Sequence, residues 1–189
     1  GTWNQIGQDL LGGDAGDQAG WSVDLSADGS IVAVSSWTGG DMMEGKVRMY
    51  KYNEDLNFWD KFGQDLSGGT DSVFFGSSLS LSDTGLTVAI GADRDDGNGR
   101  DTGRVQTYWF DTLMKRWRQL GSTFEGEDPE DHAGFEVELS GDGSVIAMGV
   151  PDKDSDDGIS NVGLVRIYKL EGLGFWWGEM GSALVGTVE

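Results

Sequence analysis

Short runs of alternating apolar and polar residues follow one another along this chain, and one arrangement of runs occurs three times. In the clearest copy Leu79 and Leu81 alternate with serines, and a β-branched run at 87–90 follows. A Ser-Asp-Thr-Gly turn at 82–85 separates the two runs. Alternation of period two on both sides of a turn predicts a β-hairpin. The corresponding segments are residues 19–34, 75–92 and 133–148.

The motif Trp-x-x-apolar-Gly marks the period of the repeat. It spans residues 3–7, 59–63, 117–121 and 177–181. Each repeat holds four candidate strands: the tryptophan segment, the two hairpin strands, and a run that follows a longer polar loop. These last runs span residues 45–52, 103–110 and 163–170. Four antiparallel strands in each of several consecutive repeats are typical of β-propeller blades.

We therefore predict an all-β fold, a β-propeller segment of four-stranded antiparallel blades that forms one domain over residues 1–189. The predicted blades are 3–58, 59–116 and 117–176, and the segment 177–189 begins a fourth. A single four-stranded sheet cannot cover both of its faces, so each blade must pack against its neighbours. Three blades and one strand do not close a ring. This predicts either a longer chain or an assembly that completes the propeller.

Charge and composition narrow the function classes. The sequence has 13 Lys and Arg against 33 Asp and Glu, a formal net charge of -20. Such a field repels phosphate backbones and anionic lipids, so we expect no nucleic-acid partner and no insertion into a membrane. No apolar run approaches the roughly 20 residues that span a bilayer. The chain has no cysteine, which excludes disulfides, thiolate metal sites and a cysteine nucleophile.

Several of the repeated residues carry a family resemblance. Phe75-Gly76, followed by Ile90-Gly91-Ala92-Asp93, resembles the FG-GAP repeat, the blade unit of integrin-alpha-type propellers. The resemblance implies a surface or extracellular protein of the cell-adhesion kind that binds proteins or glycans. It also implies calcium in the hairpin turns. The turns at 26–29, 82–85 and 140–143 have one carboxylate each, so we do not expect calcium there.

Acidic clusters lie one loop later in the repeats. Asp152, Asp154 and Asp156 offer carboxylates at alternate positions, and Gly158 allows the chain to return. These three residues are the candidate Ca²⁺ ligands, and Asp93 and Asp95 form a smaller version of the cluster in the preceding repeat. The alternative interpretation is a solvated acidic loop, which is common in so acidic a chain.

Catalytic signatures are scarce. The single histidine, His132, aligns with Gln18 and Phe74 in the other repeats, which favours a linking role over that of a general base. The sequence contains no Gly-x-Ser-x-Gly and no glycine-rich loop for phosphates or dinucleotides. We therefore expect no enzyme activity, no catalytic residue and no organic cofactor.

The sequence thus favours a non-catalytic interaction or scaffold module that binds proteins or glycans or forms part of a larger assembly. Two alternatives remain open at this point. One is a glycoside hydrolase with a carboxylate pair on the propeller axis. The other is an acidic structural subunit of a large complex. We expect the protein outside the cell or at the cell surface, with a lumenal or organellar complex as the alternative.

Overall fold

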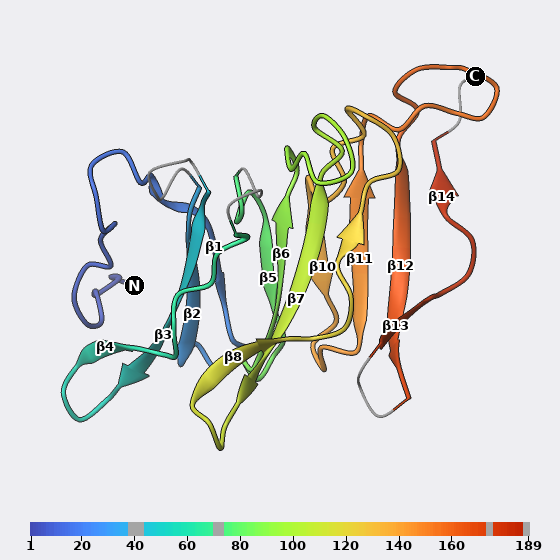
Figure 1. Cartoon of the computed structure of the whole chain (residues 1–189). Coiled ribbons are helices and arrows are strands. Elements are labelled where there is room, and N and C mark those ends of the chain that lie inside the picture. Colours follow the sequence, from blue (N-terminus) through green and yellow to red (C-terminus); the bar gives the residue numbers. More distant parts are fainter. Residues whose placement is uncertain (38–43, 70–73, 173–175, 187–189) are drawn as a thin grey trace.

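Three antiparallel β-sheets stand side by side in the computed structural model, which describes residues 1–37, 44–69, 74–172 and 176–186 (Figure 1). The first sheet has the order β1-β2-β3-β4. Its strands are β1 (Ala19–Leu25), β2 (Ile31–Ser36), β3 (Lys46–Asn53) and β4 (Phe58–Lys61). Consecutive strands are neighbours, as short connections between antiparallel strands require.

The second and third sheets repeat this order and each adds a short fifth strand. The second is β5-β6-β7-β8 with β9 beside β7, and the third is β10-β11-β12-β13 with β14 beside β12. The second sheet comprises β5 (Leu79–Leu81), β6 (Thr87–Ala92), β7 (Arg104–Asp111), β8 (Arg116–Gln119) and β9 (Phe124–Glu125). The third comprises β10 (Val137–Leu139), β11 (Val145–Val150), β12 (Leu164–Glu171), β13 (Trp176–Glu179) and β14 (Leu184–Val185).

The predicted fold class, an all-β propeller segment of four-stranded antiparallel blades, is confirmed. The described residues contain strands, turns and irregular segments and no helix. Within them, accordingly, no helix is present that could cross a bilayer.

The tryptophan segments close sheets instead of opening them, so the predicted blade boundaries shift by one strand. Trp59 lies in β4 and pairs with Tyr52 of β3, and Trp177 lies in β13 and pairs with Leu170 of β12. The reason is local: only four residues, 54–57, separate β3 from β4, and so short a connection forms an antiparallel hairpin. The segment from 177 therefore completes the third sheet, and residues 187–189 lie outside the described part.

The glycine of each tryptophan motif bends the outer strand. Beyond the bend the chain returns to the start of the long third strand of the same sheet. Three equivalent pairs result: Val47 with Leu66, Val105 with Phe124, and Val165 with Leu184. The outer side of the long third strand of each sheet is thus paired at both ends, by the tryptophan strand at one end and by the returning segment at the other.

The apolar core consists of layers between the sheets. Ile31, Ala33 and Met49 of the first sheet pack against Leu79 and Ile90 of the second, all of them buried. A second layer joins the other face of the second sheet to the third sheet. Its buried members include Ala89, Val105, Phe124, Val137, Ile146, Met148 and Trp177. Each sheet face that meets a neighbour is apolar, as stacking requires.

A repeated interlock fixes one sheet against the next. The indole N–H of Trp117 donates to the carbonyl of Phe62 at 2.9 Å, across the boundary between the second and first sheets. Gln64 then receives the backbone N–H of Trp117 at 2.9 Å and donates to its carbonyl at 2.7 Å. Trp59 makes the same three contacts with Ile6 and Gln8. The glutamine amide therefore acts as one more rung of a β-ladder between two sheets.

Glycine is required at the centre of this interlock. Gly63 has φ +84°, and a Cβ there would lie 2.7 Å from the Trp117 ring. Gly7 has φ +67° and would meet Trp59 at 2.5 Å. A side chain at either position would strain the backbone and displace the indole of the next sheet. The tryptophan and the glycine of the motif Trp-x-x-apolar-Gly therefore recur because they form a contact between neighbouring sheets.

We predict that Gln64→Ala lowers the free energy of unfolding by about 2 kcal/mol, because the backbone N–H and carbonyl of Trp117 lose their partners between two sheets. Urea unfolding followed by tryptophan fluorescence measures the change. Gln119→Ala is the matched control, since Gln119 makes only an exposed bond to Thr123. Equal losses for the two variants would contradict the interlock.

Candidate functional site

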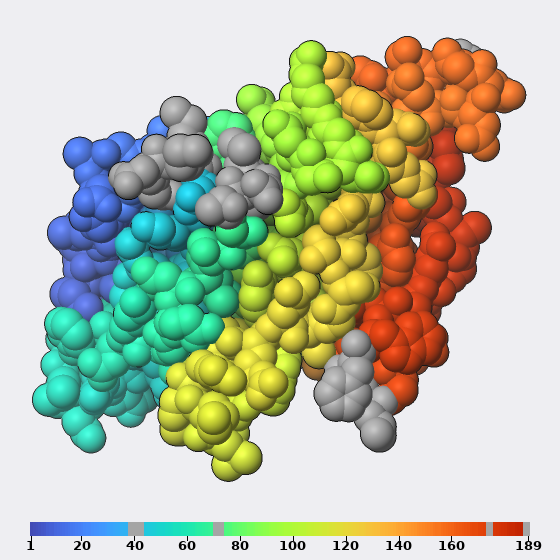
Figure 2. All heavy atoms as spheres, in the orientation of Figure 1, coloured from blue at the N-terminus to red at the C-terminus, as the bar shows by residue number. Residues whose placement is uncertain are grey.

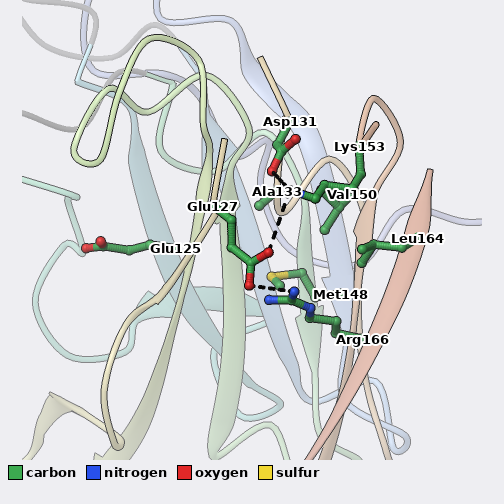
Figure 3. A pocket seen from close by; sticks show the side chains of 10 residues that line it. Glu125, Glu127, Asp131, Ala133, Met148, Val150, Lys153, Leu164 and Arg166 are labelled. Atoms are coloured by element: carbon green, nitrogen blue, oxygen red, sulfur yellow. Dashed lines mark hydrogen bonds and ion pairs between the residues drawn. The ribbon is translucent and has the colours of Figure 1, made fainter. Parts of the chain in front are cut away.

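Charged side chains gather where the loops between the second and third sheets meet (Figure 3). The link 126–134 and the loop 151–163 supply most of them, and β12 supplies Arg166. Two backbone bonds hold the link against the second sheet: His132 N–H donates to the Asp101 carbonyl at 3.2 Å, and Ala133 N–H to that of Thr102 at 2.9 Å. The position of the charges is thus fixed by the stacking of two blades.

Lys153 is the centre of this cluster. Its Nζ lies 3.2 Å from Asp131 and 3.6 Å from Glu127, and it also donates to Asp128. The Lys153 side chain is 14% exposed and that of Asp131 only 4%. Burial lowers the pKa of Lys153, but the hydrogen bonds to Asp128 and Asp131 outweigh it, and the net effect is a raised pKa. The ammonium therefore stays charged and paired.

Glu127 joins this cluster to the sheet behind it. One carboxylate oxygen lies 2.6 Å from the Arg166 guanidinium, and Figure 3 shows Glu127 pointing toward both Arg166 and Lys153. The hydrogen bond from Arg166 lowers the pKa of Glu127. Two cations, Lys153 and Arg166, thus face three carboxylates, Glu127, Asp128 and Asp131, between the blades.

The pocket that these residues line is too small for a metabolite. Its volume is about 10 Å³, room for roughly one water molecule. Asp131, Lys153 and Arg166 line it together with the apolar side chains of Met148 and Val150. We call the cluster of Glu127, Asp128, Asp131, Lys153 and Arg166 the clasp, because it links two blades. A group that reacts with a metabolite would have to lie at the exposed rim of the clasp.

His132 and Asp152 form that rim. The His132 Nδ1 lies 3.6 Å from Asp152 Oδ2, and both side chains are partly exposed. Each is the immediate neighbour of a clasp residue, Asp131 and Lys153 respectively, so the clasp positions the pair. An imidazole whose Nδ1 faces a carboxylate can use its other nitrogen to accept a proton.

The backbone at His132 is also unusual. His132 has φ +57°, and the equivalent residues Gln18 and Phe74 have φ +50° and +62°. Left-handed backbone is uncommon for residues other than glycine. The repeat therefore imposes this conformation at one position, and only the third blade places a titratable side chain there.

The structure separates the three carboxylates predicted to bind calcium. Asp152 lies beside His132, the carboxylate of Asp154 accepts the backbone N–H of Asn161 at 2.9 Å, and Asp156 is exposed. Within the described ranges, no three His, Cys, Asp or Glu side chains form a group that could hold a metal ion. Calcium binding at these residues stays a prediction without a supporting contact.

Asp93 and Asp95 are paired with arginines instead of facing a common centre. Asp95 is buried and lies 2.7 Å from Arg104, and Asp93 lies 3.9 Å from Arg94. Each carboxylate thus has a cation of its own beside it. A further cation would have to compete with these arginines.

An aromatic stack occupies the boundary between the first and second sheets. Trp21 and Trp37 stack with ring centroids 4.1 Å apart, and Phe74 lies 4.5 Å from Trp37. The Arg94 guanidinium lies 5.8 Å from the Phe74 ring. Phe74 and Arg94 hold the repeat positions that His132 and Asp152 hold one blade later. The same pair of positions thus carries a cation–π contact in one blade and an ionisable pair in the next.

Three of the solved structures that share this fold are named as lactonases. The chain aligns with a provisionally assigned 6-phosphogluconolactonase of Bacteroides fragilis at 10% identity and TM-score 0.56, and with one of Bacteroides uniformis at 12% and 0.57. A periplasmic gluconolactonase of Pseudomonas aeruginosa gives 17% and 0.55. These alignments cover 87%, 89% and 87% of this chain but only 38%, 41% and 39% of the other chains. No family model and no curated protein matches the sequence.

These comparisons correct the resemblance to FG-GAP repeats, because the structural neighbours are lactonase-type propellers. The physical reason lies in the glycines that carried the resemblance. Gly76 has φ +95° and a Cβ there would lie 2.8 Å from Ser35, while a Cβ on Gly91 would lie 2.2 Å from the Gly134 carbonyl. Close packing of the blades therefore demands glycine at both positions in this chain. They are therefore no evidence of integrin-type ancestry.

The expected non-catalytic adhesion module, with no enzyme activity, is corrected by the same finding. The neighbours carry the names of enzymes, so the earlier alternative of a propeller enzyme is closer to them than the adhesion module is, and at 10–17% identity the likeness shows the fold alone. The glycoside-hydrolase form of that alternative stays a prediction. The expected protein or glycan partners, and the expected location, are untested and also stay predictions.

Sequence reasoning assigned His132 to a linking role and missed its neighbour Asp152 as a partner. The available signal was positional: His132 is the one ionisable side chain at a repeat position otherwise held by Gln18 and Phe74. The 3.6 Å approach depends on the conformations of two loops 20 residues apart, which no local pattern encodes.

We predict that Glu127→Gln removes part of the acid sensitivity of the fold. The folded pKa of Glu127 is lower than its ordinary value of 4.5, so its contribution to stability is present at neutral pH. That contribution is lost as the pH falls below about 4.5 and through the folded pKa. Melting temperatures between pH 7 and pH 3 should therefore differ between wild type and variant at neutral pH and converge in acid.

Glu125→Gln is the control for this experiment, since the Glu125 side chain points away from the cluster (Figure 3). Its melting curve should follow that of the wild type at every pH. A constant gap between the wild type and Glu127→Gln from pH 7 to pH 3 would count against the clasp.

Proposed function

We propose that this chain supplies three blades of a propeller enzyme that hydrolyses sugar lactones, with His132 as the general base. The His132–Asp152 pair at the rim of the blade boundary is the observation that supports this assignment. The lactonase-type neighbours support the reaction class by fold alone. Because the chain spans about two fifths of the length of these neighbours, other blades would complete the enzyme.

The chemistry needs one proton acceptor near an ester carbonyl. Neutral His132 takes a proton from water as the oxygen attacks the lactone carbonyl carbon. The tetrahedral intermediate then collapses, the bond from the carbonyl carbon to the ring oxygen breaks, and the imidazolium returns its proton to that oxygen. The product is the open hydroxy acid. Asp152 is a positioning residue that holds the imidazole and stabilises its charged form.

The charge of the chain favours a neutral substrate. At a formal net charge of -20, the field around the protein repels a phosphorylated sugar and also drives away the anionic product. Trp21, the exposed member of the aromatic stack with Trp37 and Phe74, offers a face on which an uncharged sugar ring can lie. We therefore propose an unphosphorylated aldonolactone as the substrate class.

The substitution His132→Gln tests the assignment. Gln18 already adopts the same left-handed backbone at the equivalent position, so the variant should fold normally. We expect kcat for glucono-δ-lactone hydrolysis to fall about 100-fold with little change in KM, since a general base contributes roughly that factor. Stopped-flow absorbance with a pH indicator, corrected for the spontaneous reaction, measures both constants.

Asp156→Asn is the control, because Asp156 is an exposed carboxylate of the same loop with no contact to His132. It should retain wild-type rates. Wild-type protein that adds nothing to the spontaneous hydrolysis of the lactone would refute the proposed function. Equal kcat for wild type and His132→Gln would remove His132 from the mechanism.

A further inference from the structure

We propose that Asn98 deamidates spontaneously, and that the carboxylate which replaces its amide weakens the contact between the second and third sheets. The site lies in the loop 93–103, which connects β6 to β7. Two observations support it: the dipeptide Asn98-Gly99, and a hydrogen bond that the Asn98 amide makes across the blade boundary. The reaction is separate from the proposed function and does not depend on it.

The chemistry is that of an asparagine followed by a glycine. The backbone nitrogen of Gly99, after it loses its proton to solvent, attacks the side-chain carbon Cγ of Asn98. A bond from this nitrogen to Cγ forms, the bond from Cγ to Nδ2 breaks, and Nδ2 takes up a proton and leaves as ammonia. Water then opens the cyclic imide at either of its two carbonyls. The products are aspartate and isoaspartate, and water is the only reagent consumed.

The structure requires the glycine that favours this attack. A side chain on the residue after an asparagine hinders the approach of the backbone nitrogen, and Asn98 is the one asparagine of the sequence that precedes a glycine. Gly99 has φ +146°, and a Cβ there would lie 3.2 Å from the methyl group of Thr102. Any other residue would strain the loop. The loop therefore keeps Asn98 next to its most reactive neighbour.

The surroundings of Asn98 leave the reaction possible in the folded protein. Asn98 is exposed, so hydroxide and water can reach its amide. The Gly99 N–H donates to the Asp96 carbonyl at 3.2 Å, the long end of the range for such bonds. This bond must open before the nitrogen can attack. Backbone bonds in exposed turns open more easily than those inside a sheet.

The Asn98 amide connects two blades. Its Nδ2 donates to the Gly126 carbonyl at 3.0 Å, and Gly126 stands at the start of the link 126–134 that leads into the third sheet. The Gly126 N–H donates to the Gly103 carbonyl at 2.9 Å, so loop and link are held together by several bonds. Figure 2 shows the green loop and the gold link next to each other on the surface. The link also carries His132.

Deamidation turns this attraction into repulsion. A carboxylate has no hydrogen to donate, so the product places two acceptors opposite each other, the new carboxylate and the Gly126 carbonyl. It also adds a negative charge near Glu127 in a chain whose formal net charge is already -20. Isoaspartate in addition inserts a carbon atom into the backbone before Gly99, whose carbonyl accepts the Thr102 N–H at 3.4 Å. Both products therefore loosen the boundary.

Asn161 provides a control within the same chain. It lies in the loop 151–163, the equivalent loop of the third blade, and it is exposed. The residue that follows it is Val162, whose branched side chain hinders the backbone nitrogen. The two asparagines thus share solvent access and differ in the neighbour that must attack.

Peptide mass spectrometry after incubation in mildly alkaline buffer made with oxygen-labelled water tests the reaction. The peptide with Asn98 should gain the label in two forms, aspartate and isoaspartate, because water opens the ring at either carbonyl. The peptide with Asn161 should stay unlabelled over the same period. An Asn98 that stays intact in the folded protein but reacts in the urea-unfolded chain would overturn the inference, and so would equal rates at the two asparagines.

The substitution Asn98→Asp tests the effect on the blade boundary. We expect the equilibrium constant of unfolding to rise about tenfold, because the Gly126 carbonyl loses a donor and faces an acceptor. Urea unfolding followed by tryptophan fluorescence measures the change. Asn161→Asp adds the same charge to an exposed loop and should unfold as the wild type does. If Asn98→Asp does not fold, aged wild type separated from fresh protein by anion exchange takes its place. Unfolding of Asn98→Asp, or of the aged protein, at the wild-type urea concentration would contradict a role of the amide between the blades.

Discussion

The packing of one sheet face on another is the interaction on which the rest of this protein depends. Each four-stranded sheet has two apolar faces, and only a neighbouring sheet can cover them. The buried layer of Ile31, Met49, Leu79 and Ile90 shows how one pair of faces is satisfied. The Trp117–Gln64 interlock fixes the orientation of the second sheet relative to the first, because hydrogen bonds are directional and apolar packing is not.

The charged clasp follows from the same stacking. Lys153 and Arg166 come from the third blade, while the link with Glu127 and Asp131 is held against the second blade by backbone bonds to 101 and 102. In a chain with so many carboxylates, most acids repel one another at the surface. At this boundary they are paired with cations, and the pairing brings His132 beside Asp152.

Much of the fold was predictable from the sequence. The Leu79 and Leu81 alternation, the turns with Asp28 and Asp142, and the period of the tryptophan motif are local signals. In the first of these turns Asp28 accepts hydrogen bonds from the Ser26 hydroxyl and the Ser30 backbone N–H, which lower its pKa to about 2. Function was less predictable. The glycines at 76 and 91 indicated a family to which the comparisons give no support, because these glycines are required by the close packing between blades.

The sequence by itself determined the hairpins, their number and the all-β class, since these depend on neighbouring residues and on the period-two alternation of side chains. The short connection 54–57 is a local feature that assigns the tryptophan strand to the preceding sheet. How each sheet then meets its neighbour, through contacts such as those of Trp117 with Phe62 and Gln64, was decided only by the tertiary structure. The tertiary structure also decided that Asp152 lies beside His132, and that it does not form one cation site with Asp154 and Asp156. Contacts between loops depend on how blades stack, and stacking is a property of whole faces.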